Sequence, residues 1–139
     1  MSALNPALKR RREVARRVND VLGKHPEVTS VYVFGSVASG HVDDRSDVDI
    51  TLVCRSEILP LSARKNILSQ IGSKWRFDDI SQKHPIWDAY DRDGIVDDIP
   101  VDAHYQTVSS VSQVLDEVVN NGAIATEKIP FLPYTLAAL

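Results

Sequence analysis

Apolar positions recur along the chain with two periods, and the alternation between these periods predicts an α/β protein. Between Asn5 and Gly23 the apolar residues have helical spacing, and an N-cap asparagine followed by proline marks the start of this helix. Residues 28–34 are rich in β-branched and aromatic side chains, which is typical of a buried strand. Residues 47–54 alternate between polar and apolar positions and predict a second strand.

The second half of the chain continues the alternation of helices and strands. A helix is predicted from Pro60 to Gly72, and a strand near residues 87–90 that ends in a turn at 91–94. Residues 99–106 predict another strand, and residues 109–120 a helix. We therefore expect an α/β (α+β) fold with a small mixed β-sheet flanked by helices.

Length and composition indicate a single domain of ordinary globular type. The 139 residues are 43% hydrophobic and 25% charged, which suffices for one core, expected at about residues 24–122. The apolar run at residues 129–139 ends without a polar cap, so we expect residues 1–139 to be the N-terminal part of a longer protein. The only cysteine, Cys54, lies in an apolar strand and is expected to be a core residue.

Charge and hydropathy narrow the possible partners. The formal net charge of −3 argues against binding nucleic acid through overall charge. No apolar run approaches the roughly 18 residues that a membrane span needs, and no secretory signal is present, so a cytoplasmic location is expected. The basic run at residues 9–12, with Arg16 and Arg17, is either the solvated face of a helix or a phosphate-binding surface, and we favour the solvated face.

Candidate chemistry is concentrated where the first strand ends and the second begins. Gly35 and Ser36 follow the first strand, and a glycine turn lets backbone N–H groups approach an anion. Asp47 and Asp49 have the two-residue spacing that puts both carboxylates on one face of a strand. Neighbouring carboxylates repel each other and favour a hard cation such as Mg²⁺ or Mn²⁺.

These motifs resemble the signature of the DNA polymerase beta-like nucleotidyltransferase superfamily. The matching segment reads GSVASGHVDDRSDVD, and its spacing is similar to that of the small prokaryotic, minimal nucleotidyltransferases. Ser39 departs from the pattern, since many relatives have arginine there. The resemblance covers roughly residues 28–106.

The resemblance implies a third carboxylate from a later strand, in an apolar–Asp–apolar setting. Asp102, between Val101 and Ala103, fits this setting best. Asp97 and Asp98 are the alternatives, but they precede Pro100 and are expected to lie in a loop. His104 would share a face with Asp102, where it would orient this carboxylate, touch the acceptor or have a structural role, and we favour the structural role.

The resemblance also implies a reaction, namely nucleotidyl transfer from a nucleoside triphosphate to an acceptor hydroxyl. Gly35 and Ser36 would bind the triphosphate, while Asp47, Asp49 and Asp102 would hold two Mg²⁺ ions, or Mn²⁺. The acceptor, a small molecule or a protein hydroxyl, is not identified by the sequence. A helical partner domain or a second copy of the chain are further candidate partners.

Two other functions remain open. The segment Asp47-Val48-Asp49-Ile50-Thr51 also matches the Asp-x-Asp-x-Thr nucleophile loop of haloacid-dehalogenase-type phosphatases, but there the first aspartate follows a buried strand. Alternatively, the chain is an antitoxin-like binding module with a nucleotidyltransferase fold that acts mainly through a protein partner. Three carboxylates together have a chemical use in an enzyme that they would lack in such a module.

Overall fold

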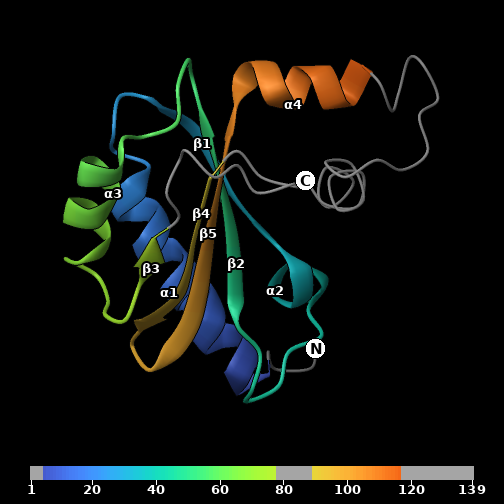
Figure 1. The fold of residues 1–139 in the computed structure, drawn as a ribbon. Helices are drawn as coiled ribbons and strands as arrows, with labels where there is room; N and C mark the ends of the chain where they lie inside the picture. The colour runs from blue at the N-terminus through green and yellow to red at the C-terminus, as the bar shows by residue number, and fades with distance from the viewer. Residues whose placement is uncertain (1–4, 78–88, 117–139) are drawn as a thin grey trace.

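A five-stranded mixed sheet forms the centre of the fold (Figure 1). The computed structural model describes residues 5–77 and 89–116. The strand order is β1-β2-β5-β4-β3, in which β2 and β5 are parallel and the other neighbours antiparallel. The strands are β1 (Val28–Phe34), β2 (Val48–Cys54), β3 (Arg76–Phe77), β4 (Ala89–Val96) and β5 (Ile99–Thr107). The predicted α/β class with a small mixed sheet is confirmed.

Helices flank this sheet on both faces. Figure 1 shows α1 and α3 on one face and α4 on the other, while α2 follows directly from the end of β1. Their bounds are α1 (Pro6–Leu22), α2 (Gly35–Ser39), α3 (Leu61–Leu68) and α4 (Val108–Leu115). None of the helices in the described ranges is long and apolar enough to cross a membrane.

The start of α1 follows from its first residues, as the sequence predicted. The Asn5 side chain accepts a hydrogen bond from the backbone N–H of Ala7, and Pro6 occupies the first helical position, where no N–H is needed. The apolar stripe of the helix, which includes Val18 and Leu22, is fully buried against the sheet. This packing stabilises the helix far more than its intrinsic propensity does.

The two faces of β2 have different roles because side chains alternate along a strand. Val48, Ile50 and Leu52 are fully buried and belong to the same hydrophobic core as the apolar stripe of α1. Asp49 and Thr51 project from the opposite face. The fold thus assigns one face of the sheet to stability and leaves the other for polar side chains. Cys54, at the end of the strand, is a buried free cysteine in the core, as predicted.

Two sequence predictions for the middle of the chain were wrong. Helix α3 ends at Leu68 rather than near Gly72, and residues 69–71 form turns instead. Residues 91–94, predicted as a turn, lie inside β4, where a β-bulge interrupts the pairing with β5. The polar Asp-Arg-Asp-Gly composition suggested a turn, but tertiary pairing overrides that preference.

Other predictions fall beyond the described residues. For the strand predicted at residues 87–90, the structure describes residues 89 and 90, and both belong to β4. Of the helix predicted at residues 109–120, the structure describes α4, whose N-cap Thr107 accepts a hydrogen bond from the N–H of Ser110. The remainder of that helix and the apolar run at 129–139 lie outside the described ranges.

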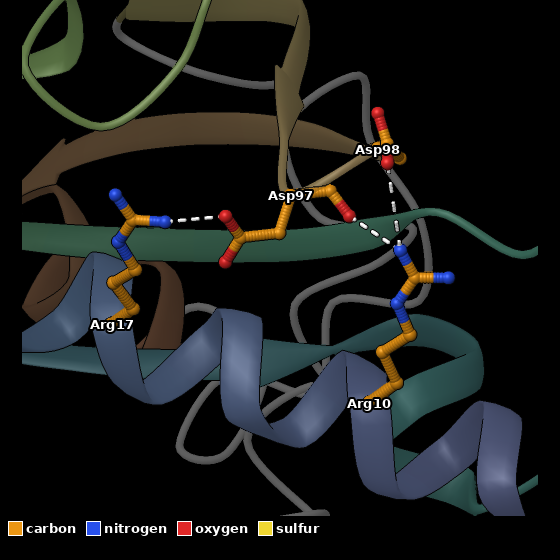
Figure 2. Close-up of polar contacts among 4 residues, drawn as sticks. All are labelled: Arg10, Arg17, Asp97 and Asp98. Carbon is orange, nitrogen blue, oxygen red and sulfur yellow. Dashed lines mark hydrogen bonds and ion pairs between the residues drawn. The ribbon is translucent and has the colours of Figure 1, made fainter.

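One side of α1 is tied to the hairpin turn between β4 and β5 by ion pairs (Figure 2). Arg17 pairs with the carboxylate of Asp97, and Arg10 donates to the Asp97 carbonyl at 2.7 Å and lies 3.9 Å from the carboxylate of Asp98. Both aspartates have positive φ (48° and 65°), the conformation that a two-residue hairpin turn requires. Asp97 and Asp98 therefore form the turn, and the prediction that they lie in a loop is confirmed. All four side chains are exposed, so the pairs contribute little stability.

Candidate active site

Three aspartates from two neighbouring parallel strands converge on one face of the sheet. Asp49 in β2 and Asp102 in β5 are register partners, and Asp47 lies two residues before Asp49, just ahead of the strand. One carboxylate oxygen from each of the three lies within 4.8 Å of the other two. The structure therefore brings together the three carboxylates that the sequence singled out.

The electrostatics of this cluster favour a cation. Burial, together with the negative charges of Asp47 and Asp102, raises the pKa of Asp49 to about 7. Burial also raises the pKa of Asp102. Because charge accumulates here without an arginine or lysine to neutralise it in the described residues, the oxygen ligands suit a hard divalent ion.

Residues of β4 donate hydrogen bonds to the carboxylate of Asp102. The backbone N–H of Asp93 donates to Oδ1 of Asp102 at 2.9 Å, and the Tyr90 side chain donates a second hydrogen bond to this carboxylate. Both hydrogen bonds lower the pKa of Asp102 and so act against the effect of burial. Asp93 lies in the β-bulge and has a φ of 58°, so the bulge turns its N–H towards the site. Sequence reasoning missed both residues, because it treated Asp93 as part of a turn and gave Tyr90, in the predicted strand, no role.

Gly35 lies against the central carboxylate. Its φ is 68°, and a Cβ at this position would lie 2.7 Å from Oδ2 of Asp49. Any other residue would therefore be strained and would displace Asp49. Ser36 is the next residue, half-buried in the first turn of α2. The glycine–serine turn is thus next to the carboxylates, as the sequence predicted.

A buried arginine positions the segment that leads into Asp47. Arg11 is 4% exposed, and its Nε donates to the carbonyl of Ser46 at 2.8 Å. The prediction of a solvated basic face is therefore wrong for this residue. The signal was available, since Arg11 lies at helical spacing between Leu8 and Ala15 in the apolar stripe of α1. Asp43 and Asp44 are exposed in the loop that leads to Asp47.

His104 lies two residues beyond Asp102 on the same face of the sheet, among aromatic side chains. His104 stacks on Tyr90 at a centroid distance of 4.4 Å and meets the edge of the Phe34 ring at 5.0 Å. Its Nδ1 is 3.2 Å from the carbonyl oxygen of Ile50 on the adjacent strand. These contacts fit the structural role, and His104 is 5% exposed. His41 is exposed in the loop after α2.

The phosphatase alternative does not fit this arrangement. A nucleophilic aspartate of that kind would follow a strand, whereas Asp47 precedes β2 and Asp49 lies within it. Comparison with protein-family models gives a match over residues 16–88, just over half of the chain, to the family described as polymerase beta, nucleotidyltransferase. The chain belongs to this nucleotidyltransferase family. The resemblance predicted from the Gly-Ser and Asp-x-Asp motifs is confirmed.

Solved structures support the same fold for this nucleotidyltransferase domain. A chain in the structure of the GLD-2/RNP-8 complex matches with a TM-score of 0.50 and 16% sequence identity, over 82% of this chain. The match covers 45% of that solved chain, so the present chain spans less than half of its length. At this identity the similarity concerns the fold alone. A search of curated proteins gives no sequence match.

Replacing Gly35 by alanine tests how tightly the turn and the carboxylates of the nucleotidyltransferase domain fit together. Gly40→Ala is a matched control, because Gly40 also has a positive φ (82°) but a Cβ there would meet no atom within 4 Å. Both variants should lose about 1 kcal/mol from backbone strain. Only Gly35→Ala should also weaken Mn²⁺ binding, by about tenfold or more, because its Cβ pushes the Asp49 carboxylate aside. Equal Mn²⁺ affinity of the two variants, measured by isothermal titration, would show that the close contact has no bearing on the site.

Proposed function

We propose that this domain transfers a nucleoside monophosphate from a nucleoside triphosphate to an acceptor hydroxyl, with release of pyrophosphate. The observation that carries the proposal is the convergence of Asp47, Asp49 and Asp102 within 4.8 Å beside the glycine turn, in a chain of the nucleotidyltransferase family. Phosphoryl transfer depends on positioning and charge stabilisation more than on covalent help from the protein. Three fixed carboxylates at one edge of a parallel strand pair meet that need.

The donor set fits two Mg²⁺ ions, or Mn²⁺. All three ligands are carboxylate oxygens. Burial and mutual repulsion disfavour the charged form of Asp49 and raise its pKa, and bound cations would offset both effects. Such ions, when bound, neutralise the developing charge on the attacking and leaving oxygens. Asp47 and Asp49 would hold both ions, and Asp102 would complete one ion's ligands.

The remaining roles follow from position. The N–H of Asp93 donates to the Asp102 carboxylate and restrains it, and Asp102 would take the proton of the acceptor hydroxyl. Gly35 and Ser36 would bind the triphosphate through backbone N–H groups and the serine hydroxyl. The acceptor is a small molecule or a protein hydroxyl, and the cytoplasm, which supplies nucleoside triphosphates and Mg²⁺, is the proposed location.

Thermal stability in the presence of each nucleoside triphosphate tests this function without knowledge of the acceptor. With Mg²⁺, a saturating triphosphate should raise the melting temperature by several degrees, because a ligand at about 100 times its Kd adds roughly 2.7 kcal/mol to the native state. The rise should vanish in EDTA and in Asp47→Asn. A rise of the same size in EDTA or in this variant would contradict nucleotide binding at the three aspartates.

One feature favours a second candidate, a binding module that acts through a protein partner. Many relatives have arginine at the position of Ser39. The Ser39 hydroxyl donates a hydrogen bond to the Ser36 carbonyl, and this side chain supplies no positive charge beside the glycine–serine turn. Under this alternative the domain would bind its partner equally well after loss of Asp47, and no triphosphate would need Mg²⁺ to bind. The same titration therefore separates the two candidates.

A further inference from the structure

The six basic residues noted in the sequence of α1 do not share one environment. Arg10 and Arg17 pair with the β4–β5 hairpin on one flank of the helix, and Arg11 is buried beneath it. Arg12 and Arg16 are exposed, four residues apart on the other flank, and neither forms an ion pair within residues 5–77 and 89–116. Lys9 is also exposed and outside these ion pairs, but Arg12 and Arg16 are the two that lie together on this flank.

Both arginines line a groove beside the sheet edge. The groove has a volume of about 400 Å³ and lies between α1, β1 and α2. Its walls include Arg12, Arg16, Asn19, Val31, Val33 and Val37. An acidic side chain entering this groove would meet two guanidinium groups above an apolar floor.

A second groove lies on the other face of the same strand. It has a volume of about 380 Å³ and is formed by β1, β2 and α4. Its walls include Ser30, Tyr32, Val53, Val108 and Val111, and Val108 is one of the two exposed large apolar residues of the described chain. This groove carries no charged side chain, in contrast to the first.

The strand between the two grooves is at the edge of the sheet. In the described part of the chain β1 pairs with β2 alone, so its other side presents backbone N–H and C=O groups to a further strand. Val31 and Tyr32 line both grooves, which places the grooves at the same height on opposite faces. Side chains of an added strand would enter the two grooves alternately.

We propose that β1 is a docking edge for an extended peptide with alternating acidic and apolar side chains. The acidic residues enter the groove with Arg12 and Arg16, and the apolar residues enter the groove with Val53 and Val111. Charge complementarity distinguishes this occupant from a second copy of β1, whose sequence VTSVYVF offers no carboxylate to the arginines. This inference is independent of the proposed nucleotidyl transfer, since none of these residues belongs to the aspartate cluster.

Binding of a labelled six-residue peptide of alternating glutamate and valine to the full chain tests this proposal. Fluorescence anisotropy should show saturable binding, and hydrogen exchange should slow in residues 28–34. Arg12→Glu with Arg16→Glu should weaken binding by about tenfold or more, since both charges facing the peptide are reversed. The matched pair Arg10→Glu with Arg17→Glu, on the opposite flank of the same helix, should change affinity less than about twofold.

Five outcomes would overturn the proposal. A peptide of the same composition without alternation, or one with lysine in place of glutamate, could bind equally well. The Arg12 and Arg16 reversals could leave peptide affinity unchanged. A single-stranded oligonucleotide could bind and displace the peptide, which would make the groove a nucleic-acid surface. Self-association that disappears with the same reversals, seen by sedimentation, would make β1 a contact between copies.

Discussion

Asp49→Asn should abolish nucleotidyl transfer and at the same time make the metal-free protein more stable at neutral pH. Activity should fall by about 10³-fold or more, because the substitution removes a charged ligand at the centre of the cluster and several kcal/mol of transition-state stabilisation with it. Stability should rise because the asparagine amide keeps the shape of the side chain but carries no charge to be buried between Asp47 and Asp102.

The pH dependence of this stability follows from the sign of the pKa change. The ordinary pKa of the Asp49 carboxyl is 3.8, and in the folded state it is about 7. Between these values the folded protein binds a proton that the unfolded chain has released, so the unfolding free energy falls as pH rises from about 4 to about 7. We expect a loss of about 3 kcal/mol across this window in the metal-free wild type, and a much smaller one in Asp49→Asn.

Thermal unfolding in EDTA at several pH values measures both effects. At pH 7 the variant should melt roughly 5–10 °C above the wild type, and the difference should shrink towards pH 4. Mg²⁺ or Mn²⁺ should raise the wild-type melting temperature at pH 7 and leave that of the variant nearly unchanged. A variant that melts below the wild type at pH 7, or that keeps its activity, would remove the basis for the site.

The candidate site could be predicted from sequence because its geometry follows from strand periodicity. Asp47 and Asp49 are two residues apart, so they share a face wherever the strand is placed. Asp102 lies between two apolar residues of a strand, so its side chain points to the face opposite theirs. That β2 and β5 are parallel neighbours, with Asp49 opposite Asp102, depends on the sheet order, and the family resemblance implied only that a later strand supplies the third carboxylate. Local pattern thus identified the side chains, while topology brought them together.

The residues that support the site were missed for a different reason. The supporting contacts join residues that are 9 to 35 positions apart in the sequence, and one of them depends on a bulge. No local sequence pattern predicts such contacts, which are made by Arg11, Tyr90 and Asp93. Composition even pointed the wrong way at residues 91–94, where Asp and Gly suggested a turn. The position of the Asp102 carboxylate depends on this bulge. A Cβ on Gly94 would lie 2.4 Å from the Trp75 ring and would therefore disturb the bulge.

The largest departure from the sequence pattern is a buried ion pair between α3 and β4. Nη1 of Arg64 lies 3.1 Å from Oδ1 of Asp91, and both side chains are 0% exposed. The guanidinium also lies over the ring of Tyr105, 5.2 Å from its centroid. In the sequence, Arg64 is one polar residue among several in a short helix, and Asp91 belongs to the supposed turn, so neither was expected in the interior.

Removing one partner of this pair should therefore have the largest effect on stability. Arg64→Met should lower the unfolding free energy by about 3–5 kcal/mol, because it leaves the carboxylate of Asp91 buried without its cation. The double variant Arg64→Met with Asp91→Leu should recover most of that loss, since burying two charges costs nearly as much as their attraction returns. Arg76→Met is the matched control, because its 3.6 Å pair with Asp93 is exposed (71% and 56%), and it should change stability by less than about 0.5 kcal/mol.

Urea unfolding of the four proteins measures these differences. If Arg64→Met costs no more than Arg76→Met, the buried pair has no special weight in this fold. If the double variant is as unstable as Arg64→Met, the loss comes from packing around Arg64 and Tyr105 rather than from an unpaired charge. The expected pattern, a large loss in the single variant and recovery in the double, would show that the loss comes from a buried carboxylate without its cation, on the strand whose bulge holds Asp102.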